Sequence, residues 1–191
     1  MTSGKNKAIF IDKDGTLIPD IPYNVDPEKI SLQEGALAGL LQLQEAGYLL
    51  IIVSNQSGVA RGLFKEEALL HVQHKIETLL AEKGVVLNGF YYCPHYPNAA
   101  IKEYAIACDC RKPQPGMLLK AARELDIDLS QSWMIGDMLN DVEAGKKAGC
   151  KTVLIDNGNE KDYLVNEVRT PDYNAQNIEE AAIQILKHVK V

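Results

Sequence analysis

Apolar and polar positions divide this chain into two kinds of segment. Short runs with apolar residues at successive positions predict strands buried on both faces, as in a parallel sheet, over residues 8–12, 48–53, 89–92, 133–137 and 151–156. Apolar residues at helical spacing predict helices over 34–46, 65–83, 116–125, from the end of the fourth strand to Ala148, and 177–190. This alternation predicts an α/β fold, a doubly wound, Rossmann-like parallel sheet flanked by helices with right-handed crossovers.

Two long segments between these elements are predicted to be loops. Residues 17–31 contain three prolines, and residues 93–115 are rich in cysteine, proline and charge. Loops of this length in a compact domain are often functional. Neither is long enough to form a separate cap domain. We therefore expect one domain over residues 1–191, with its site covered only by these loops.

The composition is that of an ordinary globular protein, with 46% hydrophobic and 24% charged residues. A net charge of −6 and the lack of a basic stripe argue against a general nucleic-acid binder. Residues 1–7 have no apolar core of the signal-peptide type, and no later stretch is long enough to span a membrane. We expect a cytoplasmic monomer whose four cysteines stay reduced and serve metal binding or packing.

Polar residues follow three of the predicted strands, at Asp12, Ser54 and Asp137. The carboxyl ends of parallel strands meet at one edge of the sheet, where ligands bind. Asp14 is two residues after Asp12, so both carboxylates should share one face, and such close like charges need a cation or a shared proton. We interpret this as a Mg²⁺ site with Asp12 as nucleophile and Asp14 as general acid and base. Lys13 should point to the opposite side and take no part.

The alternative for the two aspartates is a turn cap, which explains Gly15 and one aspartate but not Asp12 directly after a strand. Ser54, with the backbone N–H groups of Asn55 and Gln56, can hold a phosphoryl group; a turn serine is the alternative. Ser57 can add a further backbone donor. Arg61 can meet a second phosphate, or be a solvated surface arginine.

Arg111 and Lys112 are adjacent cations before a proline, a pattern that indicates an anion site. A solvated charged loop is the alternative. Asp141 lies four residues after Asp137, which would put both on one helical face. There Asp141 can hydrogen-bond Lys112 or a metal-bound water, or be an ordinary surface acid.

Three cysteines and a histidine gather in the second loop, as Cys93, His95, Cys108 and Cys110. Four nitrogen and sulfur ligands with no open position are typical of a structural Zn²⁺ site. Unrelated buried thiols are the alternative. A zinc ion would order the loop and fix Arg111 and Lys112, which directly follow Cys110. Cys150 stands alone and is expected to pack in the core.

The chain resembles the haloacid dehalogenase (HAD) superfamily in four motifs, which are residues 12–16, Ser54, Lys112, and 136–137 with Asp141. The resemblance implies a phosphotransferase-type site, with Mg²⁺ held by the Asp12 carboxylate, the Asp14 backbone carbonyl and the Asp137 carboxylate. It implies that Lys112 stabilises the negative charge on the transferring phosphoryl group. Arg111 is then free to bind the rest of the substrate.

Within that superfamily, the cysteine loop and the run 111–117 resemble the bacterial D-glycero-D-manno-heptose-1,7-bisphosphate 7-phosphatases. The resemblance implies removal of the 7-phosphate of a phosphosugar through an aspartyl-phosphate intermediate, and sugar contacts from Asp20 and Tyr23. Met138 stands where this family often has lysine, which leaves the sugar and its anomer open. The alternatives are a histidinol-phosphate phosphatase, which shares the cysteine loop, and an inactive, zinc-ordered binding protein.

Overall fold

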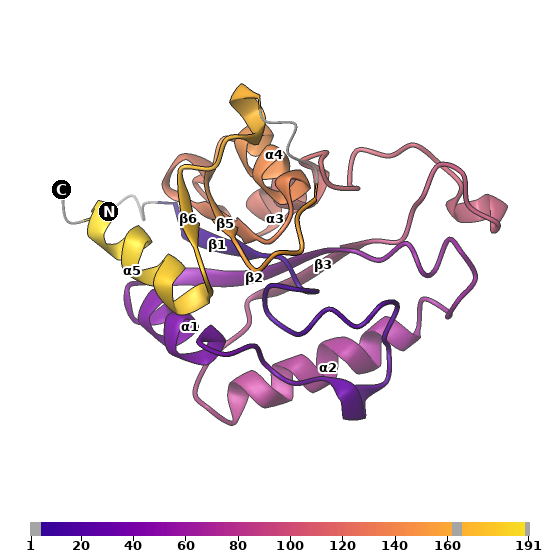
Figure 1. The fold of residues 1–191 in the computed structure, drawn as a ribbon, viewed down its shortest axis with the longest axis horizontal. Coiled ribbons are helices and arrows are strands. Elements are labelled where there is room, and N and C mark those ends of the chain that lie inside the picture. Colours follow the sequence, from indigo (N-terminus) through magenta and orange to yellow (C-terminus); the bar gives the residue numbers. More distant parts are fainter. Residues whose placement is uncertain (1–4, 162–165, 190–191) are drawn as a thin grey trace.

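Residues 5–161 and 166–189 are described by the computed structural model (Figure 1), in which one parallel sheet forms the centre. Its strands are β1 (Lys7–Ile11), β2 (Tyr48–Asn55), β3 (Gly89–Cys93), β4 (Trp133–Gly136), β5 (Lys151–Ile155) and β6 (Tyr173–Ala175). They lie in the order β3-β2-β1-β4-β5-β6, and every pair is parallel. The predicted doubly wound sheet is confirmed.

The helices cover both faces of the sheet. They are α1 (Ala36–Glu45), α2 (Ala68–Ala81), α3 (Gly116–Glu124), α4 (Leu139–Ala148) and α5 (Ile178–Val189), with short 3₁₀ helices η1 (Pro27–Lys29), η2 (Lys102–Tyr104), η3 (Leu129–Gln131) and η4 (Glu167–Arg169). Figure 1 shows α1, α2 and α5 on one face and α3 and α4 on the other. Side chains of β1 alternate between the two cores, Ile9 and Ile11 toward the first and Ala8 and Phe10 toward the second. Both faces are therefore buried, as the continuous apolar runs predicted.

The strand order reverses between β1 and β4. From β1 the chain winds outward through β2 and β3, then returns to β4 and winds the other way through β5 and β6. A crevice opens beyond the carboxyl ends of the strands at such a reversal. The Asp12 N–H donates to the Ile135 carbonyl at 2.9 Å, which extends the pairing of β1 and β4 to the edge of this crevice.

Some element bounds differ from the sequence prediction. β2 continues through Ser54 and Asn55, because these residues pair with Tyr92 and Cys93 of β3. α2 begins at Ala68 rather than Lys65, since the chain first makes a turn in which the Ala68 N–H donates to the Lys65 carbonyl at 3.0 Å. The short strand β6 was not predicted. The last residue of the expected closing helix, Lys190, lies outside the described residues.

The connections from β1 to α1 and from β3 to α3 are long loops that contain only η1 and η2 as regular elements in the described chain. The second connection contacts the segment after β2, where the Ile101 N–H donates to the Ala60 carbonyl at 3.1 Å. Tyr104 also donates its hydroxyl hydrogen to Glu66 at 2.8 Å. Among the described helices, none has the length and apolar character needed to cross a bilayer.

Candidate active site

Three carboxylates meet in the crevice between β1 and β4. Asp12 follows β1, Asp137 follows β4, and Asp141 lies in the first turn of α4. All three are buried, and ligand oxygens of the three lie within 4.8 Å of one another. We call these residues the carboxylate cluster. The prediction that the tips of separate strands converge is confirmed for Asp12 and Asp137.

Asp137 and Asp141 do not share a helical face, as their spacing had suggested. Asp137 precedes α4, whose first residue is Leu139, so the chain is extended at Met138 between them. Asp141 turns back because its Oδ2 accepts the Met138 N–H at 3.1 Å, which caps the helix. The two carboxylates meet because the strand end and the first helical turn are adjacent.

Lys112 supplies a positive charge to the carboxylate cluster. Its ammonium group is buried, contacts Asp12, lies 2.6 Å from Asp141 Oδ1 and donates to the Val53 carbonyl at 2.9 Å. The predicted hydrogen bond between Asp141 and Lys112 is therefore confirmed. Asn55 fixes the Lys112 backbone by accepting from its N–H and donating to its carbonyl, both at 3.0 Å.

Burial and mutual repulsion shift the acidity of this cluster. Burial raises the pKa of Asp12 to about 7, opposed by Lys112 and reinforced by the charges of Asp141 and Asp14. Burial and the charge of Asp12 raise the pKa of Asp137 to about 6. Burial would lower the pKa of Lys112, but the Asp12 and Asp141 charges raise it. One ammonium cannot neutralise three buried carboxylates, and hard oxygen donors in this number fit a cation such as Mg²⁺.

The Asp14 carboxylate stands apart from the cluster and is held from two sides. Lys13 Nζ lies 2.5 Å from Asp14 Oδ1, and Gln56 donates to Asp14 Oδ2 at 3.0 Å and to Ser54 Oγ at 2.8 Å. The prediction that Lys13 points away is wrong. The chain turns directly after Asp12, so strand alternation no longer applies, and the buried Lys13 ammonium takes the nearest carboxylate as its partner.

The expected phosphate contact from the Gln56 backbone is not available. The Gln56 N–H donates to the Cys93 carbonyl at 2.8 Å, because the pairing of β2 and β3 continues to this point. Ser54 is fully buried at the end of β2. Two of the predicted phosphate donors, the Ser54 hydroxyl and the Lys112 ammonium group, are side chains that line one cavity together with Asp12.

Two cavities adjoin these residues. One of about 140 Å³ is lined by Asp12, Asp14, Ser54, Asn55, Lys112, Met138, Asn140 and Asp141. The other, of about 280 Å³, is lined by Asp14, Asp20, Pro22, Tyr23, Asn24, Asn55, Gln56, Ser57 and Gly58. The predicted substrate residues of the first loop thus meet the segment after β2 at Asp14. Tyr23 has a φ of 56°, an unusual backbone conformation for a tyrosine in a loop that borders a cavity.

Arg61 and Arg111 line neither of these cavities. Both guanidinium groups lie over the ring of Tyr96, with Cζ 4.3 Å and 5.1 Å from the ring centroid respectively. The sequence indicated both arginines as candidate phosphate ligands, but it did not indicate Tyr96, whose ring lies close to both.

The loop after β5 contacts Asp137, although no residue of this loop was a sequence candidate. Asn159 donates to Asp137 Oδ2 at 2.7 Å, and Thr16 donates to Oδ1 at 3.2 Å. Asn157 donates to the Gly15 carbonyl at 2.7 Å. A side chain at Gly15, whose φ is +86°, would place its Cβ 2.1 Å from Asp137 Oδ2. The polar residues 156–159, which follow β5, were the feature of the sequence that could have indicated this contact.

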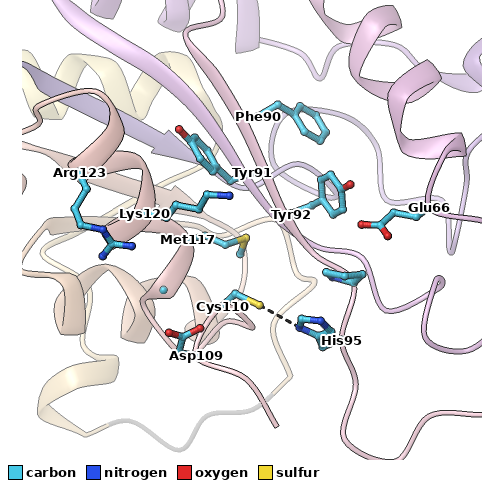
Figure 2. A pocket seen from close by; sticks show the side chains of 12 residues that line it. Glu66, Phe90, Tyr91, Tyr92, His95, Asp109, Cys110, Met117, Lys120 and Arg123 are labelled. Atoms are coloured by element: carbon cyan, nitrogen blue, oxygen red, sulfur yellow. Dashed lines mark hydrogen bonds between the residues drawn. The ribbon is translucent and has the colours of Figure 1, made fainter. Parts of the chain in front are cut away.

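The second candidate metal site lies in the loop between β3 and α3, where two residues from its start meet two residues from near its end. Cys110 Sγ lies 2.9 Å from Cys93 Sγ, 3.2 Å from Cys108 Sγ and 3.4 Å from His95 Nδ1. Figure 2 shows Cys110 and His95 pointing toward each other beside a cavity of about 440 Å³. We call Cys93, His95, Cys108 and Cys110 the cysteine–histidine cluster. Its thiols form no disulfide, and its ligand atoms lie within 4.8 Å of one another, which fits one tetrahedral ion such as Zn²⁺.

The remaining cysteine is separate from this cluster. Cys150 is buried among apolar residues in the core that α3 and α4 form against the sheet. The prediction that it packs in the core is confirmed.

A parallel sheet of this order with carboxylates after β1 and β4 defines a HAD-like hydrolase. The family model described as HAD-hydrolase-like matches residues 109–181. Relatives named D-glycero-beta-D-manno-heptose-1,7-bisphosphate 7-phosphatase include one from Photorhabdus laumondii, 46% identical over 78% of this chain and 79% of that protein, and one from Pasteurella multocida, 48% identical over 80% and 83%. This chain belongs to the family of D-glycero-beta-D-manno-heptose-1,7-bisphosphate 7-phosphatases, which are phosphoric monoester hydrolases.

A solved structure supports the same assignment. The D,D-heptose 1,7-bisphosphate phosphatase from B. bronchiseptica, complexed with magnesium and phosphate, superposes with a TM-score of 0.77. It is 31% identical, and the match covers 95% of this chain and 99% of that chain.

Proposed function

We propose that this protein hydrolyses the 7-phosphate of D-glycero-β-D-manno-heptose 1,7-bisphosphate, a step toward nucleotide-activated heptose and lipopolysaccharide core precursors. The observation that carries the proposal is the meeting of Asp12, Asp137, Asp141 and Lys112 at one buried point next to the cavities. The names of the relatives support the substrate and its β anomer.

In the proposed mechanism, the Asp12 carboxylate attacks phosphorus and forms an aspartyl phosphate, while Asp14 gives a proton to the leaving sugar oxygen. Asp14 then takes a proton from the water that hydrolyses this intermediate. Lys112 and Ser54 hold the phosphoryl oxygens as charge redistributes. Because Gln56 and Lys13 bond the Asp14 carboxylate, they orient its free lone pairs.

We propose that Asp12, the Asp14 carbonyl and Asp137 hold Mg²⁺, with Asp141 acting through Lys112. The ion would neutralise charge on the phosphoryl group and keep Asp12 ionised despite its burial. Asn55, Gln56, Ser57, Asp20, Tyr23 and Met138, which line the two cavities, would contact the sugar. Arg61 and Arg111 would bind the second phosphate.

We propose that the cysteine–histidine cluster binds one structural Zn²⁺. Four ligands leave no open position, so the ion would order the loop rather than take part in chemistry. Arg111 and Lys112 directly follow Cys110, so an ion that orders the loop would also fix the positions of both residues. We further propose that residues 1–191 act as one domain, as a cytoplasmic monomer without nucleic-acid or membrane partners.

The test is phosphate release by purified protein with Mg²⁺ from the β-heptose bisphosphate, its α anomer and histidinol phosphate. We expect the highest kcat/KM on the β anomer and loss of turnover in Asp12→Asn. Asp128→Asn, at a partly buried position that caps η3 outside the site, is a matched control that should keep full activity. Equal rates for wild type and Asp12→Asn would refute the proposed chemistry, and a preference for histidinol phosphate would refute the substrate.

A further inference from the structure

Two arginines from separate loops meet at one aromatic ring. Arg61 lies in the segment after β2, Arg111 follows Cys110, and the ring of Tyr96 lies within cation–π range of both guanidinium groups, at 4.3 Å and 5.1 Å. Figure 1 shows the two loops extending side by side beyond the carboxyl ends of the strands, and the bond from Ile101 N–H to the Ala60 carbonyl joins them.

Neither arginine has a carboxylate partner. Within residues 5–161 and 166–189, no ion pair involves Arg61 or Arg111. Arg61 is exposed and Arg111 is half-buried. Two like charges held near one ring without a counter-charge repel each other, and a doubly charged anion such as a phosphate monoester would relieve that repulsion.

The backbone beside Tyr96 is held by residues next to the cysteine–histidine cluster. Tyr96 follows His95, and its N–H donates to the Tyr104 carbonyl at 3.1 Å. Arg111 donates to the His95 carbonyl at 3.3 Å. The ring and one arginine therefore belong to one connected unit, whereas Arg61 reaches the ring from the other loop.

We propose that Tyr96 is a positioning residue that aligns Arg61 with Arg111 on the second phosphate of the substrate, and so favours a bisphosphate over a monophosphate. The inference rests on the proposed function, because it concerns the phosphate that is not removed. The aromatic ring of Tyr96, rather than its hydroxyl, positions the two arginines. Within the described residues the Tyr96 hydroxyl makes no hydrogen bond. Tyr96→Phe should therefore behave as wild type.

The test compares wild type, Tyr96→Leu and Tyr96→Phe on heptose 1,7-bisphosphate and on heptose 7-phosphate, which lacks the second phosphate. For Tyr96→Leu we expect KM on the bisphosphate to rise about tenfold with little change in kcat, because two cation–π contacts are lost. Its kcat/KM on the monophosphate should stay unchanged, and Tyr96→Phe should restore the wild-type KM.

An unchanged KM in Tyr96→Leu, or an equal loss on both substrates, would overturn the inference. Zinc content and the thermal midpoint check that the loop is folded. If Tyr96→Leu does not fold, Tyr96→Met fills similar space without a π-face and makes the same comparison. A wild type that is inactive on the bisphosphate would contradict the proposed function itself, whereas an active wild type with an unaffected variant contradicts only the role of Tyr96.

Discussion

The carboxylate cluster and the cysteine–histidine cluster differ in what holds their ligand atoms in place. Asp12 and Asp137 follow two adjacent central strands, and backbone pairing of β1 with β4 fixes their separation. In the cysteine–histidine cluster, only Cys93 ends a strand, and the other three ligands lie on a loop between β3 and α3. The sheet can preorganise the first cluster, whereas in our proposal the second relies on a bound ion to order its loop.

The two clusters also differ in burial. The three carboxylates are all buried, so their charges repel strongly, and a bound cation or a proton would relieve this repulsion. Three of the four zinc-type ligands are only partly buried. Removing a cation should therefore change the charge balance of the first cluster and the loop order of the second.

The largest expected effect is on catalysis through Lys112. Lys112→Met removes the positive charge beside Asp12 and Asp141, and kcat should fall by about 10²–10³, as for the loss of a group that stabilises transition-state charge. The measurement is kcat on the bisphosphate with saturating Mg²⁺. Lys120→Met, which removes a lysine on α3 over the ring of Tyr91, is the matched control. A loss below about tenfold would argue against the role of Lys112.

Cys108→Ser tests whether the second cluster depends on its ion. We expect zinc to fall from about one ion per chain to none, with lower stability and faster proteolysis of residues 94–109, because site formation and loop order are coupled. Cys150→Ser is the matched control, since Cys150 is buried in the core outside the cluster. Cys150→Ser should keep its zinc, and its free energy of unfolding should fall by about 1–3 kcal/mol. Full zinc in Cys108→Ser would contradict the ligand assignment.

The stability of Mg²⁺-free protein should fall as pH rises. The pKa of Asp12 is raised from 3.8 to about 7 and that of Asp137 from 3.8 to about 6, so between 3.8 and these raised values the folded state binds more protons than the unfolded state. We expect a loss of stability on the order of a few kcal/mol from about pH 4 to about pH 7. Denaturant melts with zinc retained measure it. Mg²⁺ should flatten the slope, and identical slopes with and without Mg²⁺ would argue against a cation at this cluster.

The smallest expected effect concerns Asn159, which donates to Asp137. Asn159→Ala should raise the Mg²⁺ concentration needed for half-maximal activity about tenfold, because it leaves one carboxylate oxygen unoriented. Asn166→Ala, which removes the cap of η4, should not change it. An unchanged Mg²⁺ requirement in Asn159→Ala would show that Thr16 and the backbone suffice to orient Asp137.

Much of this arrangement could be predicted from the sequence because it depends on local pattern. Continuous apolar runs predicted five strands, and the polar residue after each central strand predicted the position of the carboxylate cluster. β6 escaped prediction because it has three residues, one of them Asn174, and lies at the edge of the described sheet beside β5. Periodicity does not reveal a strand that short.

Side-chain partners were less predictable. Lys13 was expected to point away from Asp14, and Asp141 to lie on one helical face with Asp137. Both predictions extended regular geometry past the end of the strand, where the chain turns. Asn159 contacts Asp137 from the loop after β5, and Arg61 contacts Tyr96 from the segment after β2, so no spacing in the sequence could indicate these two contacts.

The sequence by itself determined the fold class, the edge of the sheet that carries the chemistry and both sets of candidate ligands, because residue type and short-range spacing are sufficient for these. The sequence already indicated a contact between Lys112 and Asp141, but only the tertiary structure decided that Lys112 also pairs with Asp12 and that Lys13 pairs with Asp14. The tertiary structure also decided that Arg61 and Arg111 share the ring of Tyr96. The physical reason is that a buried or crowded charge takes a partner close in space, and in this chain such partners often come from distant loops.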